Sequence, residues 1–182
     1  MNIPFFKSNI GQEEEQAVLS VLRSGWLAQG PKVQEFEEKF AEYVGAKYAI
    51  AVNSCTSALF LNLFFLDVEK PSGVTNILVP SFTFSASASI VTHIPIWPHH
   101  GIFFVDINKN DYCFNVESVF KSFSLFEKVN SGPGRKVGVI VPHLMGNEAK
   151  VKKIKTLETV KFIIEDSAHR IKRNTQGENP VC

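Results

Sequence analysis

The stretch "IIEDSAH", residues 163–169, joins an apolar run to two adjacent acids and a histidine. Such a run predicts a buried strand that delivers Glu165, Asp166 and His169 to its carboxyl end. An ionised acid in this position is costly unless a cation pairs with it. The cation could belong to a ligand or to a basic side chain of the protein, and a helix cap is a third explanation.

A segment of small polar residues, "NSCTS" at 53–57, follows a short β-rich run, "KYAIAV" at 47–52. These residues stand at the start of a strongly apolar segment of helix length. The free backbone N–H groups and the positive dipole end at a helix start favour an anion such as phosphate. Serine and threonine are also common helix caps, and a purely structural role explains the segment as well.

Two aromatic side chains, Phe82 and Phe84, lie in "PSFTF" between another predicted strand, 76–79, and a helix of small residues. One of them could belong to the core, while the other remains to stack on a flat ligand. The three strand ends together fit a ligand that carries a phosphate, a flat ring and a ring cation. Pyridoxal 5′-phosphate (PLP) has these features, and a carboxylate such as Asp166 would keep its pyridine nitrogen protonated.

These strand ends can meet only if the strands are parallel, because ligands of open α/β sheets bind beyond the shared carboxyl edge. Apolar runs of strand length alternate with helical segments, which predicts an α/β fold with a mainly parallel sheet and helices on both faces. The predicted strands are 47–52, 76–79, 101–108, 136–144 and 161–164, and the predicted helices are 13–25, 30–45, 57–66, 85–91, 115–126 and 147–160.

The composition is that of one packed domain, with 182 residues of which 45% are hydrophobic. The 19 basic and 18 acidic side chains nearly cancel, which gives no electrostatic reason to expect nucleic acid or an anionic membrane as a partner. Neither a membrane-spanning segment nor a signal peptide is evident, so we expect a cytoplasmic protein. The three cysteines show no CxxC spacing and predict neither disulfides nor a metal site.

Long segments of the chain resemble the DegT/DnrJ/EryC1/StrS family of PLP-dependent sugar aminotransferases, which have the fold-type I, aspartate aminotransferase-like fold. Residues 3–59 resemble the N-terminal pattern of that family, and "VPSFTFSASAS", "FVDIN", "VPHLMGN" and "IIEDSAH" follow in the family's order. The resemblance implies PLP as cofactor, a nucleotide-linked keto sugar as substrate, and glutamate or glutamine as amino donor. It also implies a homodimeric full-length enzyme in nucleotide-sugar and polysaccharide biosynthesis.

The resemblance assigns roles to five residues around the cofactor. It implies that Cys55 and Thr56 contact the phosphate and that Phe84 stacks on the ring. Asp166 would pair with the pyridine nitrogen, and His169 would lie near the ring hydroxyl.

The resemblance also places "SGWLAQGP", residues 24–31, near the sugar substrate. Trp26 and Leu27 are therefore candidates for substrate contact. Either side chain could instead be an anchor that packs the N-terminal helices together, and for Trp26 this second explanation is preferred.

The resemblance finally implies a Schiff-base lysine in an "SF…K" context after residue 182, since Lys172 lies in "HRIKR", where the family does not place it. We therefore expect an N-terminal helical segment at 1–46 and, at 47–182, part of the PLP-binding large domain. The chain would then be truncated before the lysine motif and the small C-terminal domain, and inactive alone. Two alternatives are a PLP-dependent sugar dehydratase of the same family and a non-catalytic truncated subunit that binds a partner chain.

Overall fold

The computed structural model describes residues 3–4, 7–68, 74–94, 101–121 and 136–171. Its helices are α1 (Gln12–Ser24), α2 (Pro31–Val44), α3 (Cys55–Val68), α4 (Ser85–Thr92) and α6 (Val151–Lys155), with a short 3-10 helix, η1 (Leu144–Gly146). Its strands are β1 (Val74–Pro80), β2 (Gly101–Val105), β3 (Lys136–Pro142) and β4 (Val160–Asp166). Residues 116–121 are also helical, up to the end of a described range.

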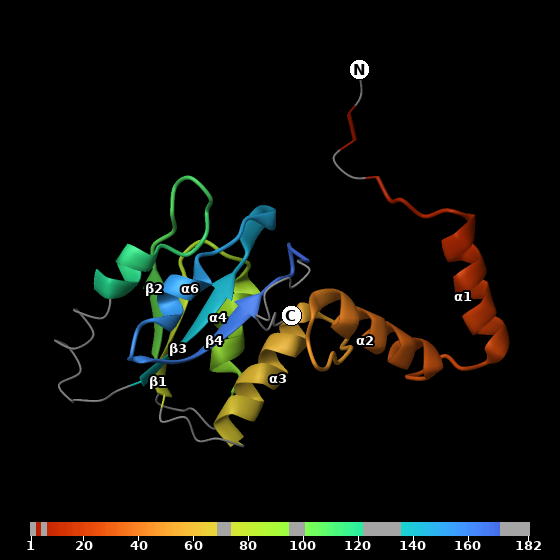
Figure 1. Cartoon of the computed structure of the whole chain (residues 1–182), viewed down its shortest axis with the longest axis horizontal. Helices are drawn as coiled ribbons and strands as arrows, with labels where there is room; N and C mark the ends of the chain where they lie inside the picture. Colours follow the sequence, from red (N-terminus) through yellow and green to blue (C-terminus); the bar gives the residue numbers. More distant parts are fainter. Residues whose placement is uncertain (1–2, 5–6, 69–73, 95–100, 122–135, 172–182) are drawn as a thin grey trace.

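The four strands form one sheet in the order β2-β1-β3-β4, and every neighbouring pair is parallel (Figure 1). Parallel strands require crossover connections, and helices lie between the successive strands of the chain. The pairing brings Pro80 beside Val105 and Pro142 beside Asp166, so the strands end along a common edge. The predicted α/β fold with a mainly parallel sheet is thus confirmed.

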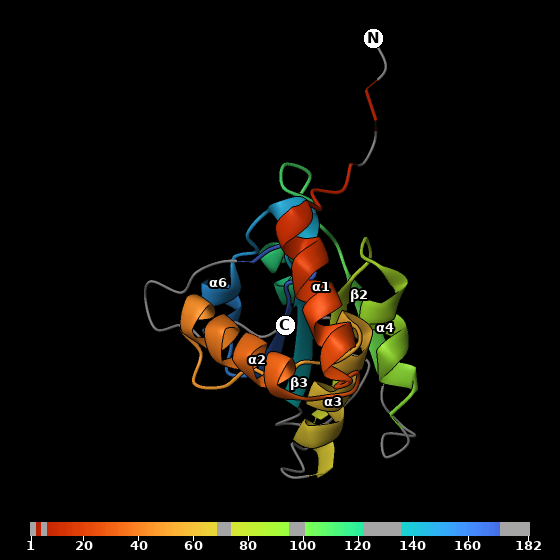
Figure 2. The ribbon, with the colours of Figure 1, turned by 90° about the vertical axis from the view of Figure 1, so that its right-hand side faces the viewer.

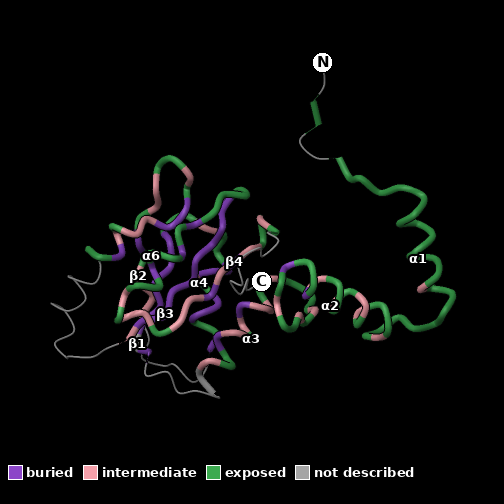
Figure 3. The backbone as a smooth tube through the Cα atoms, viewed as in Figure 1, coloured by how far each residue is buried: buried purple, intermediate pink, exposed green. Residues whose placement is uncertain are grey.

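Side chains alternate between the two faces of the sheet and build a separate core on each. The backbone coloured by burial shows buried residues along the strands, whereas α1 is almost wholly exposed (Figure 3). One core packs β-strand residues such as Val139 against α6 and residues 113–119. The other packs residues such as Ile140 and Ile164 against α3 and α4. Figure 2 shows α6 and α4 on opposite sides of the strands, so helices cover both faces as the sequence predicted.

Helices α1 and α2 form an arm that extends away from the sheet (Figure 1). Each ends at a glycine in the left-handed conformation, Gly25 at φ 73° and Gly45 at φ 70°, and these are the residues at which the predicted helices end. No residue of α1 is buried, and apolar side chains such as Leu22 and Phe36 are exposed. The division of the chain after residue 46 stays a prediction.

The predicted strand at 47–52 is wrong, because these residues form no β pairing among the described parts of the chain. A strand needs a neighbour that accepts and donates its backbone hydrogen bonds. Here the backbone N–H of Ala51 instead donates to the Glu37 carboxylate on α2, at 2.7 Å. Tyr48 and Ile50 are accordingly 74% and 79% exposed.

The predicted helix at 147–160 is also shorter than expected, since α6 covers only Val151–Lys155. Lys150 has non-helical dihedral angles, φ −81° and ψ 61°. The preceding Ala149 N–H donates to the ring of His143 at 3.1 Å. The helix therefore begins only after Lys150, and the chain before it is bonded to the turn after β3.

Gly138, in the central strand β3, has no room for a side chain. A Cβ atom at this position would overlap the Phe162 ring and approach Ile77 Cδ1 to 2.7 Å. We expect Gly138→Ala to lower the free energy of unfolding by about 1–3 kcal/mol, the usual cost of overpacking a core. Urea unfolding followed by circular dichroism checks this, and an unchanged midpoint would contradict the packing described here.

Candidate active site

Asp166, the last residue of β4, is buried on the face of the sheet that α3 and α4 cover. Ser87 Oγ of α4 donates to its Oδ2 atom at 2.9 Å. Cys55 Sγ of α3 donates to Oδ1 at 3.4 Å, and the Ala168 N–H donates to the same oxygen at 3.2 Å. The structure therefore brings Cys55 and Asp166, two residues predicted from the sequence, into direct contact.

The charge of Asp166 is not compensated within the described ranges 3–4, 7–68, 74–94, 101–121 and 136–171. All three of its donors are neutral groups, and no described basic side chain forms an ion pair with it. A buried carboxylate without a cation is costly, although hydrogen bonds reduce the cost. Among described residues, the explanation by an internal salt bridge therefore fails for Asp166, and a ligand cation fits the position.

The neighbouring acid, Glu165, has a different environment because alternate residues of a strand face opposite ways. Its Oε2 atom lies 3.1 Å from His143 Nε2, and its Oε1 atom lies 4.0 Å from Lys155 Nζ. Partners within the protein thus account for Glu165, namely a hydrogen bond with His143 and an ion pair with Lys155. Of the two adjacent acids, only Asp166 faces α3 and α4.

The start of α3 is both a capped helix end and a possible anion site, the two roles that the sequence allowed. Ser54 Oγ accepts the Ser57 N–H at 3.1 Å, and Ser57 Oγ donates to Asn53 at 2.6 Å, so Ser54 caps the helix. The exposed Thr56 has no hydrogen-bond partner for its N–H or hydroxyl among the described residues. The capped helix still offers donors and a positive dipole end next to Cys55.

The two aromatic residues of "PSFTF" differ in their surroundings. The ring of Phe82 lies 6.1 Å from that of Tyr112, tilted by 47°. Phe84 is the N-cap of α4 and is 71% exposed, and its carbonyl accepts the N–H of Ser87 at 3.1 Å. Phe84 therefore presents an open ring one helical turn from the serine that holds Asp166, consistent with its predicted role.

The remaining predicted site residues are His169, Trp26 and Leu27. His169 is exposed, and its Nδ1 atom accepts the Met145 N–H at 3.3 Å. Trp26 and Leu27 lie on the arm between α1 and α2, and the structure does not bring them to Asp166. The Trp26 indole donates to the Gln29 carbonyl at 3.0 Å, within its own turn, so its substrate role stays a prediction.

Two contacts of the site were missed by the sequence reasoning. Ser87 lies in a run of small residues that gives no signal by itself. Only its position could have indicated a role in the site, since it lies one turn after Phe84 on a helix that follows a strand. His143 follows the buried run "VGVIVP" just as Glu165 and Asp166 follow "FII", and the same signal could have found it. Lys172, named in the sequence analysis, lies outside the described residues.

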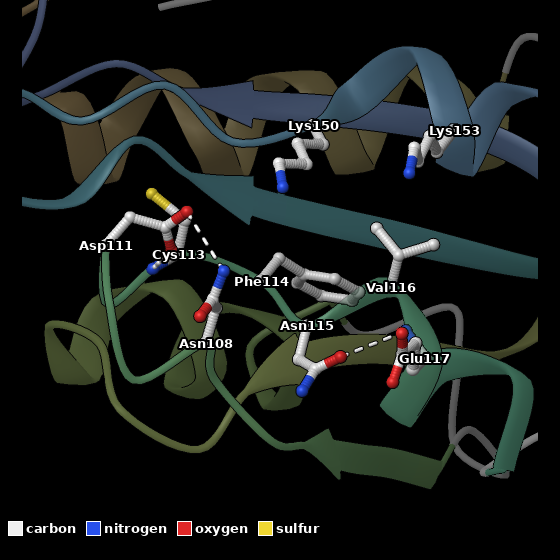
Figure 4. Close-up of a pocket in the computed structure, with 9 residues that line it drawn as sticks. All are labelled: Asn108, Asp111, Cys113, Phe114, Asn115, Val116, Glu117, Lys150 and Lys153. Atoms are coloured by element: carbon white, nitrogen blue, oxygen red, sulfur yellow. Dashed lines mark hydrogen bonds between the residues drawn. The ribbon is translucent and has the colours of Figure 1, made fainter.

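A separate pocket of about 210 Å³ lies between the loop after β2 and α6 (Figure 4). Two of its asparagine side chains already form hydrogen bonds within the lining. Asn108 Nδ2 donates to Asp111 at 3.2 Å, and Asn115 Oδ1 accepts the Glu117 N–H at 3.0 Å. It is lined by Asn108, Asp111, Cys113, Phe114, Asn115, Val116, Glu117, Lys150 and Lys153, none of which was predicted as a site residue.

The parallel sheet, with a buried aspartate at the end of one strand and helix N-termini beside it, is part of the large domain of a fold-type I PLP-dependent transferase. Within that class, the chain belongs to the DegT/DnrJ/EryC1/StrS aminotransferase family, whose model matches residues 8–181. The family that the sequence resembled is therefore confirmed.

Known relatives cover nearly all of the chain. It is 35% identical over 175 residues to the spore coat polysaccharide biosynthesis protein SpsC of Bacillus subtilis, covering 93% of this chain and 40% of SpsC. The crystal structure of a DegT/DnrJ/EryC1/StrS aminotransferase from Brucella abortus matches with a TM-score of 0.72 and 31% identity, covering 86% of this chain and 40% of that one. The chain thus spans about 40% of the length of these relatives.

A third relative shares the fold and holds the predicted cofactor. The GDP-4-keto-6-deoxy-D-mannose-3-dehydratase of E. coli, solved with bound hydrated PLP, matches with a TM-score of 0.74 and 23% identity, covering 90% of this chain and 40% of that one. The Streptococcus pneumoniae protein Spr1654, 27% identical to this chain, was also solved in a PLP form, so PLP is the cofactor of this family, as the sequence predicted. No helix of the described residues is long and apolar enough to cross a membrane.

Proposed function

We propose that this chain is the cofactor-binding part of a PLP-dependent aminotransferase that acts on a nucleotide-linked keto sugar. The observation that carries the proposal is Asp166, a buried carboxylate at a strand end whose described partners are all neutral. Family membership supports the reaction class, and the likeness to SpsC supports a role in polysaccharide synthesis. Glutamate or glutamine would be the amino donor.

The residues present fit the cofactor. Cys55 and Thr56 would hold the phosphate at the start of α3, and Phe84 would cover the ring. Asp166 would hold the proton on the pyridine nitrogen, with its carboxylate fixed by Ser87. Bound PLP supplies an electron sink for the electron pair left when a substrate C–H bond breaks.

The fixed geometry around Asp166 has a catalytic purpose in this proposal. A carboxylate that is already oriented by three donors needs no rearrangement when charge develops on the ring. Its burial excludes water, which strengthens its interaction with a ring cation. The proton on the ring nitrogen is thereby retained throughout the reaction.

The complete enzyme would include further parts. The resemblance places the Schiff-base lysine after residue 182, and that same position separates an aminotransferase from the dehydratase alternative. A homodimer in the cytoplasm, with Trp26 and Leu27 near the sugar, belongs to the same proposal. The alternative of a non-catalytic subunit would be favoured if the chain bound a partner but no PLP.

Titration of the 182-residue chain with PLP, followed by absorbance, tests the proposal. We expect a saturable change in the cofactor spectrum. After borohydride reduction, mass spectrometry should find no PLP adduct on Lys172. No saturable binding, or a specific adduct on Lys172, would contradict the site described above.

Thiol labelling gives a second test at the level of a single residue. Cys55 is partly exposed at the proposed phosphate site, so saturating PLP should slow its alkylation by iodoacetamide several-fold. Cys113 provides an internal control because it is buried, and burial raises the pKa of its thiol. Less thiolate is then present near pH 8, so Cys113 should stay unmodified with or without PLP. Peptide mapping measures both rates, and equal Cys55 rates with and without PLP would contradict phosphate binding there.

A further inference from the structure

The turn after β3 has an unusual backbone. Met145, within η1, has φ 53° and ψ 31°, and Gly146 follows with φ 80°. The left-handed conformation is uncommon for residues other than glycine and is kept only where the surrounding structure enforces it. The conformation of Met145 therefore requires an explanation in its contacts.

The turn makes one contact to a predicted site residue. The Met145 N–H donates to His169 Nδ1 at 3.3 Å. A ring nitrogen that accepts a hydrogen bond carries no proton, so the neutral imidazole has its proton on Nε2. Nε2 has no hydrogen-bond partner among the residues that the structure describes. It therefore remains available as a donor, three residues after Asp166.

The turn is itself fixed by its neighbours on β4. His143 begins it, and its backbone N–H donates to the Asp166 carbonyl at 2.9 Å. The His143 ring accepts the Ala149 N–H at Nδ1 and donates from Nε2 to Glu165, each at 3.1 Å. Arg170 donates to Glu148 at 2.6 Å and joins the same two loops a second time. The loops after β3 and β4 are thus one connected unit.

We infer that the turn at residues 144–146 is a positioning device that holds His169 in the tautomer with its proton on Nε2. His169 would then offer the cofactor ring hydroxyl a donor and never an acceptor. This second statement rests on the proposed function, whereas the tautomer is a property of the chain without ligand. Met145 acts in this inference only through His169 and is a positioning residue.

The tautomer can be measured directly on the ligand-free chain. Long-range proton–nitrogen correlation spectra distinguish the two neutral forms of a histidine ring. With the ring neutral, we expect the His169 resonance to show the proton on Nε2 and no significant exchange with the other form. A proton on Nδ1, or the mixture found in free histidine, would overturn the inference.

Two glycine variants test whether the turn causes this preference. Gly146→Ala places a Cβ at φ 80° and should disturb the turn, whereas Gly25→Ala has the same backbone problem at φ 73° on the distant arm. We expect Gly146→Ala alone to mix the tautomers and to raise the dissociation constant of PLP about three- to tenfold, the effect of one hydrogen bond. An unchanged tautomer in Gly146→Ala, or equal effects of the two variants, would overturn the role of the turn.

Replacing His169 separates its two nitrogen atoms. His169→Gln keeps a donor near the Nε2 position, and His169→Asn keeps only a group near Nδ1. Asparagine should therefore weaken PLP binding more than glutamine, and the opposite order would overturn the donor role. A proton on Nε2 with no PLP binding by any form would contradict the proposed function alone. A free-histidine mixture with normal PLP binding would contradict the positioning role alone.

Discussion

Replacing Asp166 by asparagine is expected to weaken PLP binding by about 10²- to 10³-fold. The variant keeps the shape of the side chain but removes the charge that would face the ring cation. Removing one partner of a buried ion pair costs about 3–5 kcal/mol, and each 1.4 kcal/mol is a tenfold change in affinity. Titration of wild type and variant with PLP under identical conditions measures the difference.

The same substitution should not lower the free energy of unfolding of the ligand-free chain. Asp166 is buried with neutral donors only, so its ionised form pays a desolvation cost that the amide avoids. Ser87 Oγ can accept a hydrogen bond from the new amide and turn its own hydrogen toward Thr83 Oγ1, which lies 3.2 Å away. We expect the free energy of unfolding to stay unchanged or to rise by about 1 kcal/mol, because the substitution removes a charge that serves binding and not stability.

Glu165→Gln is the matched control, since it removes a charge from the adjacent position on the opposite face. It leaves an oxygen that can accept from His143 and should leave PLP affinity within about twofold. Equal losses in the two variants would mean that PLP responds to the net charge of the strand end. A large loss of stability in Asp166→Asn would show that the carboxylate serves the fold instead.

The contrast between the two acids shows where sequence reasoning was sufficient. The apolar run before them predicted β4 and its buried end, because a strand with both faces covered reads as continuously hydrophobic. It did not decide which acid faces which core. That decision depends on the register of β4 against β3, which pairs Pro142 with Asp166, and thus on the whole sheet.

Other features could not be predicted because they depend on partners distant in the sequence. The run at 47–52 has the composition of a strand, but a strand also needs a neighbouring strand to pair with. Here the Ala51 N–H donates to the Glu37 carboxylate instead. Helix α6 begins late because Lys150 has non-helical dihedral angles, in a segment that the Ala149–His143 hydrogen bond joins to the turn after β3. A local pattern contains neither hydrogen bond.

His143→Ala is expected to lower the free energy of unfolding by about 2–4 kcal/mol. His143 is buried, and its ring satisfies the Ala149 N–H on one side and Glu165 on the other. An unsatisfied buried N–H costs about 1–3 kcal/mol, and a partly buried acid that loses its partner adds to this. Lys155, 4.0 Å from Glu165, compensates for part of the loss. Urea unfolding of the ligand-free chain measures the change.

A double-mutant cycle separates the two contacts of His143. In Glu165→Ala combined with His143→Ala, the unpaired carboxylate is gone, so the combined loss should be smaller than the sum of the single losses by about 1–3 kcal/mol. His143→Asn keeps an acceptor near Ala149 and should lose less stability than His143→Ala. If the two losses simply add, Glu165 contributes nothing through His143, and the loops after β3 and β4 are joined by other contacts.

Because the same turn holds His169, the stability lost at His143 should be accompanied by mixing of the His169 tautomers, which a purely local packing role would not produce.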